Sequence, residues 1–193
     1  MPWIDDWLPS WQFDEVHHIH SAAAPGGLLD AVAAYDPAHD RWITTALALR
    51  EAPGRLAAVL GLQSLLGTPG AFGAPDDRRR FGLGDFVALG REGDRALAYG
   101  LAGRFWEPGY GLQPLADAQA FRDFAAPGSA KLLLGFVAQR EGDSTRLTTL
   151  TRVACTDDEA RRRLAAYWAL IRPVSGLIRQ RILADIRSAA EGG

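Results

Sequence analysis

The C-terminal part of the chain carries the pattern that most constrains the fold, a long amphipathic helix with a proline inside it. At about 1.5 Å per residue, residues 157–190 would extend on the order of 50 Å, longer than one domain of this size needs from a straight rod. Pro173 has no N–H for the carbonyl of Ala169, and Gly176 loosens the next turn, so we expect a kink within residues 172–176. One apolar stripe follows the helix: Leu164, Trp168, Ile171, Leu177 or Ile178, Ile182, Ile186 and Ala189.

The start of this helix has the form of a capping box, in residues 156–159. Thr156 is expected to accept a first-turn N–H, and Glu159 to reach back to the cap. Acidic side chains here also face the positive end of the helix dipole.

Two hairpins are predicted in the middle of the chain. The tetrapeptide REGD occurs at residues 91–94 and 140–143, each time between segments rich in strand formers. Gly93 and Gly142 can take the positive φ that tight turns require. We therefore expect strands 85–90 with 96–106, and 131–139 with 145–155. In the strand at 96–106, small side chains share one face, and this face either admits a helix closely or leaves a hollow.

The remaining elements complete an α+β order within a single domain, residues 1–193. A strand is predicted at 11–20, helices at 28–35, 40–49 and 56–63, and a short helix capped by Asp117. Residues 67–84 are rich in glycine and proline and are interpreted as a long loop, either a lid or a surface insertion. Antiparallel hairpins between helices predict a curved sheet wrapped around the kinked C-terminal helix.

The charge balance excludes some partners. With 21 basic and 23 acidic side chains and a pI near 6.1, no whole-chain field attracts nucleic acid. Apolar runs are far shorter than the roughly 20 residues that span a bilayer. The single cysteine, Cys155, cannot form an internal disulfide, and the acidic start does not have the form of a secretory signal, so a cytoplasmic protein is expected.

Several segments together resemble the START-like, polyketide-cyclase-like (SRPBCC) superfamily, in a bacterial branch. These are the first strand leading to Ala-Pro, GRFW at residues 103–106, TRLTTLTRV at 145–153 and YWALIRPVSGLIR at 167–179. The resemblance implies a helix-grip fold, with a pocket for lipids, sterols, quinones or aromatic products. The family usually has seven strands and the residues indicate five, so two more would lie near 79–83 and 109–114 or be absent.

The candidate ligand-binding residues lie on the strands and on the C-terminal helix. Mid-strand arginines are expected to face water or meet a carboxylate such as Glu15 or Glu107, and an inward one would anchor a ligand. Neither a Cys-x-x-Cys nor a His-Glu-x-x-His partner accompanies the histidines of HHIH, so no metal or cofactor is predicted. The candidates are His18, His20, Tyr99, Arg104, Phe105, Thr149, Thr151, Tyr167, Trp168 and Ile171.

Three functions remain open at this point. The first is binding of an apolar small molecule, a lipid, quinone or aromatic polyketide-like compound, between sheet and helix without catalysis. The alternative is a cyclase or dehydratase whose acid–base groups, such as His18 or His20, work in the same cavity. The third is a filled-core protein whose helix or loop binds another protein. Ser21, Ser175 and Cys155 have no base at motif spacing, so nucleophilic catalysis has no support.

Overall fold

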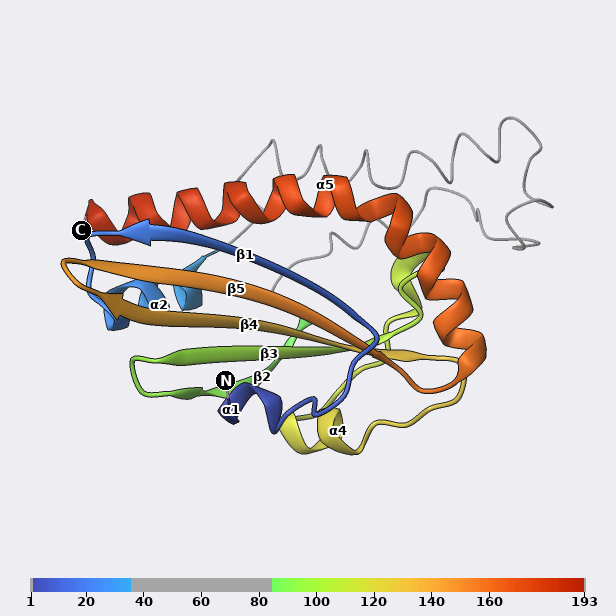
Figure 1. Ribbon diagram of the computed structural model, residues 1–193. Helices are drawn as coiled ribbons and strands as arrows, with labels where there is room; N and C mark the ends of the chain where they lie inside the picture. Colours follow the sequence, from blue (N-terminus) through green and yellow to red (C-terminus); the bar gives the residue numbers. More distant parts are fainter. Residues whose placement is uncertain (1, 36–84, 193) are drawn as a thin grey trace.

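A five-stranded antiparallel sheet forms the centre of the molecule (Figure 1). The computed structural model describes residues 2–35 and 85–192. The predicted helices at 40–49 and 56–63, the loop at 67–84 and the strand near 79–83 lie outside these residues. The strand order is β1-β5-β4-β3-β2. The bounds are β1 Phe13–Ser21, β2 Val87–Glu92, β3 Ala96–Gly103, β4 Ala130–Glu141 and β5 Ser144–Cys155.

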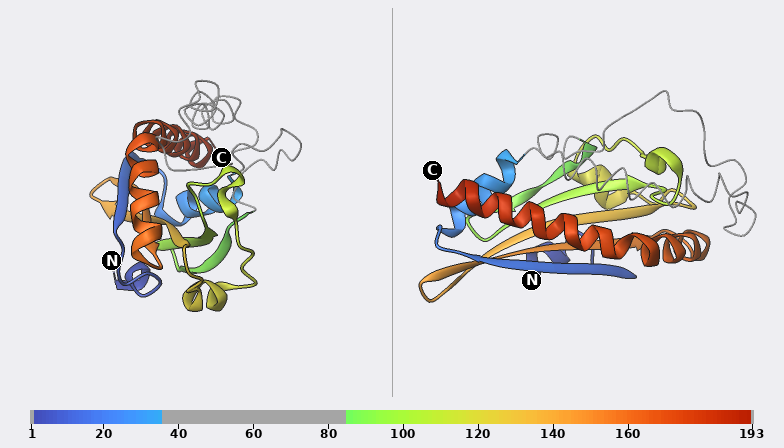
Figure 2. Two further views of the ribbon diagram at one scale, coloured as in Figure 1. Left: turned by 90° about the vertical axis from the view of Figure 1, so that its right-hand side faces the viewer. Right: turned by 90° about the horizontal axis from the view of Figure 1, so that it is seen from above.

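Helices cover both faces of the sheet (Figure 2). One face packs against α2 and α5, and the other against α1 and α4. This arrangement confirms the predicted α+β class and the long C-terminal helix beside an antiparallel sheet. Among the described helices, none combines the length and the hydrophobicity that a membrane span requires. The bounds are α1 Pro2–Asp5, α2 Pro25–Ala34, the 3-10 helix η4 Pro108–Gly111, α4 Ala118–Asp123 and α5 Asp158–Glu191.

The two REGD segments form the turns of the two hairpins, as predicted. Gly93 has φ +52° and Gly142 has φ +59°, a region that favours glycine. In both turns the arginine donates its Nε–H to the carbonyl of the glycine two residues on, Arg91 at 2.8 Å and Arg140 at 3.2 Å. The repeated tetrapeptide is therefore explained by shared turn chemistry.

The long helix α5 bends, so that its first turns and its longer C-terminal part run in different directions (Figures 1 and 2). Pro173 lies inside it and removes one helical hydrogen bond, which is the physical cause of such bends. The C-terminal part of α5 runs along β1. Of the two alternatives for the apolar stripe, Ile178 is buried and Leu177 is exposed.

The cap of α5 differs from the prediction by one residue. Asp157, rather than Thr156, is the N-cap, and its carboxylate accepts the N–H of Ala160 at 2.8 Å. Thr156 is instead hydrogen-bonded to Ser129, next to the start of β4. Its hydroxyl accepts from the N–H of Ser129 at 3.1 Å and donates to that residue's carbonyl at 2.9 Å. Glu159 forms an i,i+4 ion pair along the helix instead of closing a capping box.

The face of β3 with small side chains admits a helix and leaves no hollow. A Cβ at Gly100 would lie 2.5 Å from the ring of Phe121, so only glycine lets α4 approach this closely. Phe121 is fully buried there, together with Ile4 and Leu8 from the N-terminal segment. Space on this face is therefore not available to a ligand.

Of the two alternatives for residues 109–114, a further strand or none, the structure has no strand there. Residues Pro108–Gly111 form the 3-10 helix η4, and only a single bridge joins Gln113 to Ala102 of β3. Tyr110 in this segment has φ +62°, and Gly111 has φ +46°. A backbone turning in this way cannot extend a strand, so the described part of the sheet stays at five strands.

Candidate functional site

The candidate site lies where β1 meets the bent middle of α5. Side chains alternate along a strand, and Phe13, Glu15, His17 and Ile19 share the face toward the helix. Phe13 packs with the apolar cluster below the first turns of α5, and Ile19 packs with the cluster below its C-terminal part. Between these two apolar clusters, the helix-facing positions of β1 are therefore occupied by Glu15 and His17.

Glu15 is a buried carboxylate with only one of its oxygens engaged. The residue is 7% exposed, and its Oε1 lies 2.8 Å from Nε2 of His17. Its other oxygen, Oε2, is buried and has no hydrogen-bond partner within the described part of the chain. An unpaired oxygen of this kind is costly to bury, so the position calls for a further donor.

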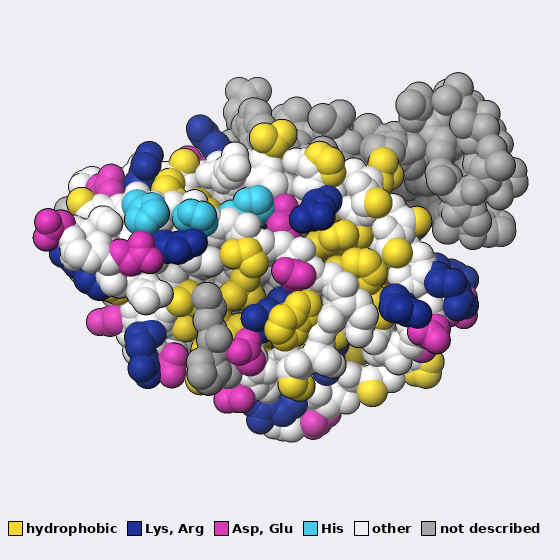
Figure 3. All heavy atoms as spheres, in the orientation of Figure 1, with side chains coloured by type: hydrophobic (Ala, Val, Ile, Leu, Met, Phe, Trp, Pro, Cys, Tyr) yellow, Lys and Arg dark blue, Asp and Glu magenta, His cyan; other side chains and the backbone are white. Residues whose placement is uncertain are grey.

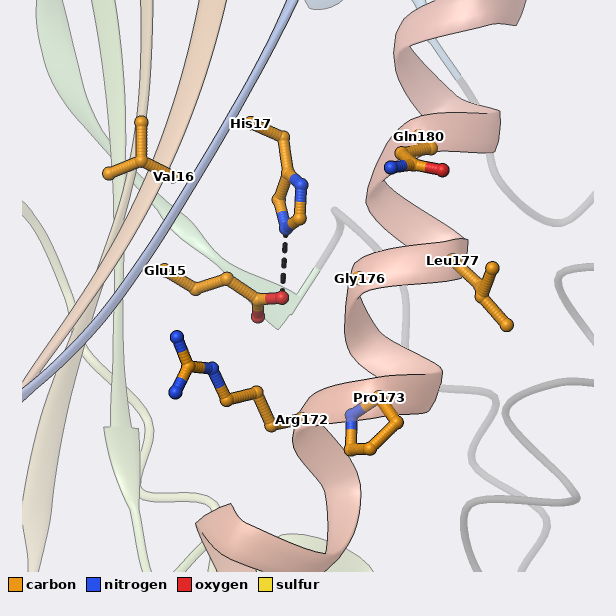
Figure 4. Close-up of a pocket in the computed structure, with 8 residues that line it drawn as sticks. All are labelled: Glu15, Val16, His17, Arg172, Pro173, Gly176, Leu177 and Gln180. Carbon is orange, nitrogen blue, oxygen red and sulfur yellow. Dashed lines mark hydrogen bonds and ion pairs between the residues drawn. The ribbon is translucent and has the colours of Figure 1, made fainter.

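A groove of about 440 Å³ opens at this carboxylate (Figure 4). The β1 side of the groove carries Glu15 and His17, and the helix side carries the turn between Pro173 and Gln180. A Cβ at Gly176 would lie 3.2 Å from Oε1 of Glu15, so this glycine lets the helix backbone approach the pair closely. The lining residues are Glu15, Val16, His17, Arg172, Pro173, Gly176, Leu177 and Gln180.

Arg172 adds a positive charge to the same groove. Its side chain extends from α5 to the side on which Glu15 lies, and no ion pair or hydrogen bond joins it to the other residues drawn (Figure 4). The groove thus combines one carboxylate, one guanidinium and one imidazole with the apolar side chains at its edge.

Two threonines extend the polar strip across the sheet. Thr151 pairs with Glu15 across β1 and β5, and Thr149 pairs with His17. Both threonines are buried, and Oγ1 of Thr149 has no partner among the described residues. The helix-facing side of β5 therefore holds a second polar atom without a partner among the described residues, Oγ1 of Thr149. It belongs to the cross-strand pair next to the pair of Glu15 and Thr151 on this face.

The structure does not place His18 and His20 in this groove. Both are exposed at even-numbered positions of β1, on the face away from α5, with their rings 6.0 Å apart. His20 is 52% exposed and its Nε2 lies 3.1 Å from a carboxylate oxygen of Glu141. Figure 3 shows the histidine side chains of β1 in a row at the surface.

The mid-strand arginines point to carboxylates, as one of the alternatives predicted. Arg104 lies just after β3, exposed, 3.7 Å from Glu107. Arg152 pairs with Asp5 and stacks at 3.7 Å on the ring of Trp11, on the face away from α5. Neither guanidinium lies among the residues of the groove.

The remaining predicted residues lie on the helix-facing side and mostly pack in its core. Phe105 and Ile171 are buried, and Tyr167 and Trp168 pack partly buried against the same cluster as Phe105. Trp168 stacks at 5.8 Å from Phe13. Tyr99 lies three strands away from Glu15 in the same cross-strand row, which runs from Glu15 through Thr151 and Leu134 to Tyr99. It is half-buried, and burial raises the pKa of its phenol.

Sequence reasoning missed Glu15 and His17 as site residues. The signal was ambiguous, because Phe13 and Ile19 favour the odd-numbered face of the strand whereas Val16 favours the even-numbered face. Val16 proves to be 54% exposed, at the edge of the groove. Period-two counting from Phe13 alone would have selected His17 in place of His18 and His20.

Metal binding and thiol chemistry find no support in residues 2–35 and 85–192. No group of three or more His, Cys, Asp and Glu there could hold a metal ion. Burial raises the pKa of the Cys155 thiol to about 11, with the neighbouring charge of Asp157 adding to the effect. The thiol therefore stays protonated at neutral pH.

Comparisons with known proteins say little about this site. No protein-family model matches the chain. No curated protein matches it in sequence. Among solved structures, TTHA0849 from Thermus thermophilus aligns over 93% of this chain and 98% of its own, with 10% identity and a TM-score of 0.30.

Proposed function

We propose that this chain binds a small molecule in the groove between β1 and the bend of α5, with an apolar body and a polar group directed at Glu15. The observation that carries the proposal is the free, buried Oε2 of Glu15 at the groove. The binding is non-catalytic, and the compound belongs to the lipid, quinone or aromatic polyketide-like classes.

Without a ligand, the unpaired oxygen of Glu15 has a free-energy cost. A buried polar atom without a partner costs about 1–3 kcal/mol, and more when it is charged. A bound donor removes this cost only in the complex, so the carboxylate favours the liganded state. Val16, Pro173 and Leu177 supply apolar surface at the edge of the groove for the rest of the molecule.

We also propose membership of the START-like, polyketide-cyclase-like superfamily, with a helix-grip fold. The five-stranded antiparallel sheet beside a long bent C-terminal helix supports this, as do the sequence segments that resemble the family. Ligand binding between sheet and helix agrees with that membership.

The test is to identify what co-purifies with the full chain. Native mass spectrometry and solvent extraction are expected to find a small molecule with the wild type and a reduced amount with Glu15→Gln. Asp14→Asn is the matched control, because Asp14 is the neighbouring carboxylate on the opposite face of β1 and is exposed. A protein that is always empty, and that takes up no compound from lipid or quinone extracts, would contradict the proposal.

The contact between His17 and Glu15 favours a second candidate, acid–base catalysis in the same groove. Glu15 holds Nε2 of His17 at 2.8 Å and leaves the other ring nitrogen available to a substrate, which is the arrangement of an oriented general base. A cyclase or dehydratase would use the pair in this way. His17→Gln must then abolish turnover of the identified ligand, while His18→Gln retains it and both variants keep the wild-type melting temperature.

A further inference from the structure

We infer that the polar group which meets Glu15 is a neutral hydroxyl, an alcohol or a phenol, rather than an ammonium or a second carboxylate. This inference rests on the proposed function and narrows its ligand classes to alcohols and phenols. It leaves out quinones, whose carbonyl oxygens only accept hydrogen bonds. It depends on the free carboxylate oxygen and the charge of Arg172 in the groove, and on a buried threonine beside Glu15 that is not among the residues lining the groove.

The first step is the requirement for a donor. Oε2 of Glu15 is buried and accepts no hydrogen bond from the described residues, whereas Oε1 is already engaged by His17. A ligand carboxylate or ether oxygen at this place would put acceptor against acceptor. The ligand atom that faces Oε2 therefore carries a proton.

The second step concerns the acceptor side of the same group. Thr149 lies on the helix-facing side of β5, diagonal to Glu15, and its hydroxyl is buried without a partner among the described residues. A threonine hydroxyl has a proton to donate, which an ammonium cannot accept. A hydroxyl both donates and accepts, so it can donate to the carboxylate oxygen and still accept from a donor such as this threonine.

The third step is charge. Arg172 directs its guanidinium to the Glu15 side of the groove, and it forms no ion pair with the residues drawn in Figure 4. A guanidinium lies on this side of the groove, so a ligand ammonium would bring a second cation to the same space. Like charges at close range repel, which favours a neutral donor.

The size of the groove accommodates an aromatic alcohol. Its volume is about 440 Å³, and Val16, Pro173 and Leu177 present apolar surface at its edge. A two-ring body can lie in the groove with its hydroxyl toward Glu15, while the side chains of Val16 and Leu177 point outward at its two edges (Figure 4). Naphthalene derivatives are therefore suitable probes, because they keep one body and change only the polar group.

The experiment measures three probes by isothermal titration calorimetry on the full chain at pH 7: 2-naphthol, 2-methoxynaphthalene and 2-naphthylmethylamine. 2-Naphthol is expected to bind about ten-fold or more tightly than 2-methoxynaphthalene, the range for a hydrogen bond to a charged group. The amine, protonated at this pH, is expected to bind more weakly than 2-naphthol. In Glu15→Gln the ratio of the two neutral probes should fall to about two-fold, and in Asp14→Asn it should stay unchanged.

The outcomes separate this inference from the proposed function. Equal affinity for 2-naphthol and 2-methoxynaphthalene overturns the hydroxyl inference and leaves ligand binding intact. Tightest binding of the amine overturns it in favour of a cationic ligand. Failure of all three probes to bind also overturns the hydroxyl inference for an aromatic ligand, and the co-purification test then decides the proposed function separately. Should Glu15→Gln lose its fold by circular dichroism, the decisive readout becomes an NMR titration of the His17 imidazole in the wild type, which must give a lower Kd for 2-naphthol than for 2-methoxynaphthalene.

Discussion

The two faces of the sheet differ in the side chains that lie beside their glycines. On the face toward α1 and α4, Gly100 of β3 receives the ring of Phe121 and Gly135 of β4 receives Ile4, so glycines make room for large apolar side chains. On the face toward the bend of α5, Gly176 is again the point of closest approach, but its neighbours are Glu15 and His17. On the first face the glycines lie against apolar side chains, and on the second the glycine lies beside a carboxylate whose Oε2 has no partner within the described part of the chain.

This difference separates stability from function. Native interiors pair nearly all buried polar atoms, so two unpaired ones on adjacent strands mark a place where stability is not the only requirement. Substitutions on the packed face should therefore change the free energy of unfolding. Shape-preserving substitutions at the polar strip should change ligand binding and leave that free energy nearly untouched.

The largest expected effect is the loss of Phe121. Phe121→Ala removes a fully buried ring and leaves a cavity between α4 and the sheet, which costs about 3–5 kcal/mol in the free energy of unfolding. Urea denaturation followed by fluorescence and circular dichroism measures it. A cost below about 1 kcal/mol would show that the packed face is not tightly packed.

The next effect comes from Gly100. Gly100→Ala places a Cβ 2.5 Å from Phe121 and is expected to cost about 1–3 kcal/mol by overpacking. Gly27→Ala is the control, since nothing lies within 4 Å of a Cβ there. In a Phe121→Ala background the cost of Gly100→Ala should shrink, because the ring that it strikes is gone. Additive costs would mean that the two residues do not meet.

On the polar face, Glu15→Gln and Thr149→Val are expected to change the free energy of unfolding by about 1 kcal/mol or less, or to raise it. Each keeps the shape of the side chain and replaces a group that has a buried oxygen without a partner among the described residues, Oε2 of Glu15 or Oγ1 of Thr149. The same urea measurement checks this prediction. A loss of several kcal/mol in either variant would show that these groups hold the fold together, and the contrast between the faces would fail.

The reactivity of the Cys155 thiol measures how accessible to solvent the helix-facing side is at the C-terminal end of β5. With its pKa raised to about 11 by burial, on the order of one thiol in a thousand is ionised at pH 8. Reaction with a disulfide reagent at pH 8 is therefore expected to be slow in the native protein and fast in urea. Equal rates would indicate that the end of this face is open to solvent.

The smallest effect concerns the start of α5. Hydrogen bonds from the N–H groups of Ala160 and Gly128 lower the pKa of the Asp157 carboxyl. Because the folded-state pKa is depressed, this stabilisation is present above the unfolded value near 4 and is lost as pH falls through the folded value. The stability difference between wild type and Asp157→Asn should therefore shrink between pH 5 and pH 3. A difference independent of pH would contradict the cap.

Much of the fold could be predicted from local patterns. The turn glycines of REGD, the cap at Asp117 and the proline of α5 each act within a few residues, and the structure places all three as expected. The error at Thr156 has a non-local cause, since Thr156 is held by Ser129 on the neighbouring strand. The sequence left open whether a further strand lies near 109–114, and a positive φ at Tyr110 and Gly111 turns the backbone away from one.

The site could be predicted only in part. Thr149 and Thr151 were expected on the ligand side, and they pair across the strands with His17 and Glu15. The choice of His18 and His20 depended on which face of β1 meets the helix, and the alternation permits both answers. Val16 is apolar, so the sequence suggests that the even-numbered face, with His18 and His20, is the buried one. In the structure Val16 is instead exposed at the groove edge.

The sequence by itself determined the element types and their order, because turn residues, capping groups and apolar periodicity act between neighbours along the chain. Only the tertiary structure decided which face of β1 lies under α5, and with it that Glu15 and His17 meet at a groove beside Gly176. The physical reason is that a strand's alternation defines two faces without naming the inner one, which depends on packing against residues more than 150 positions away.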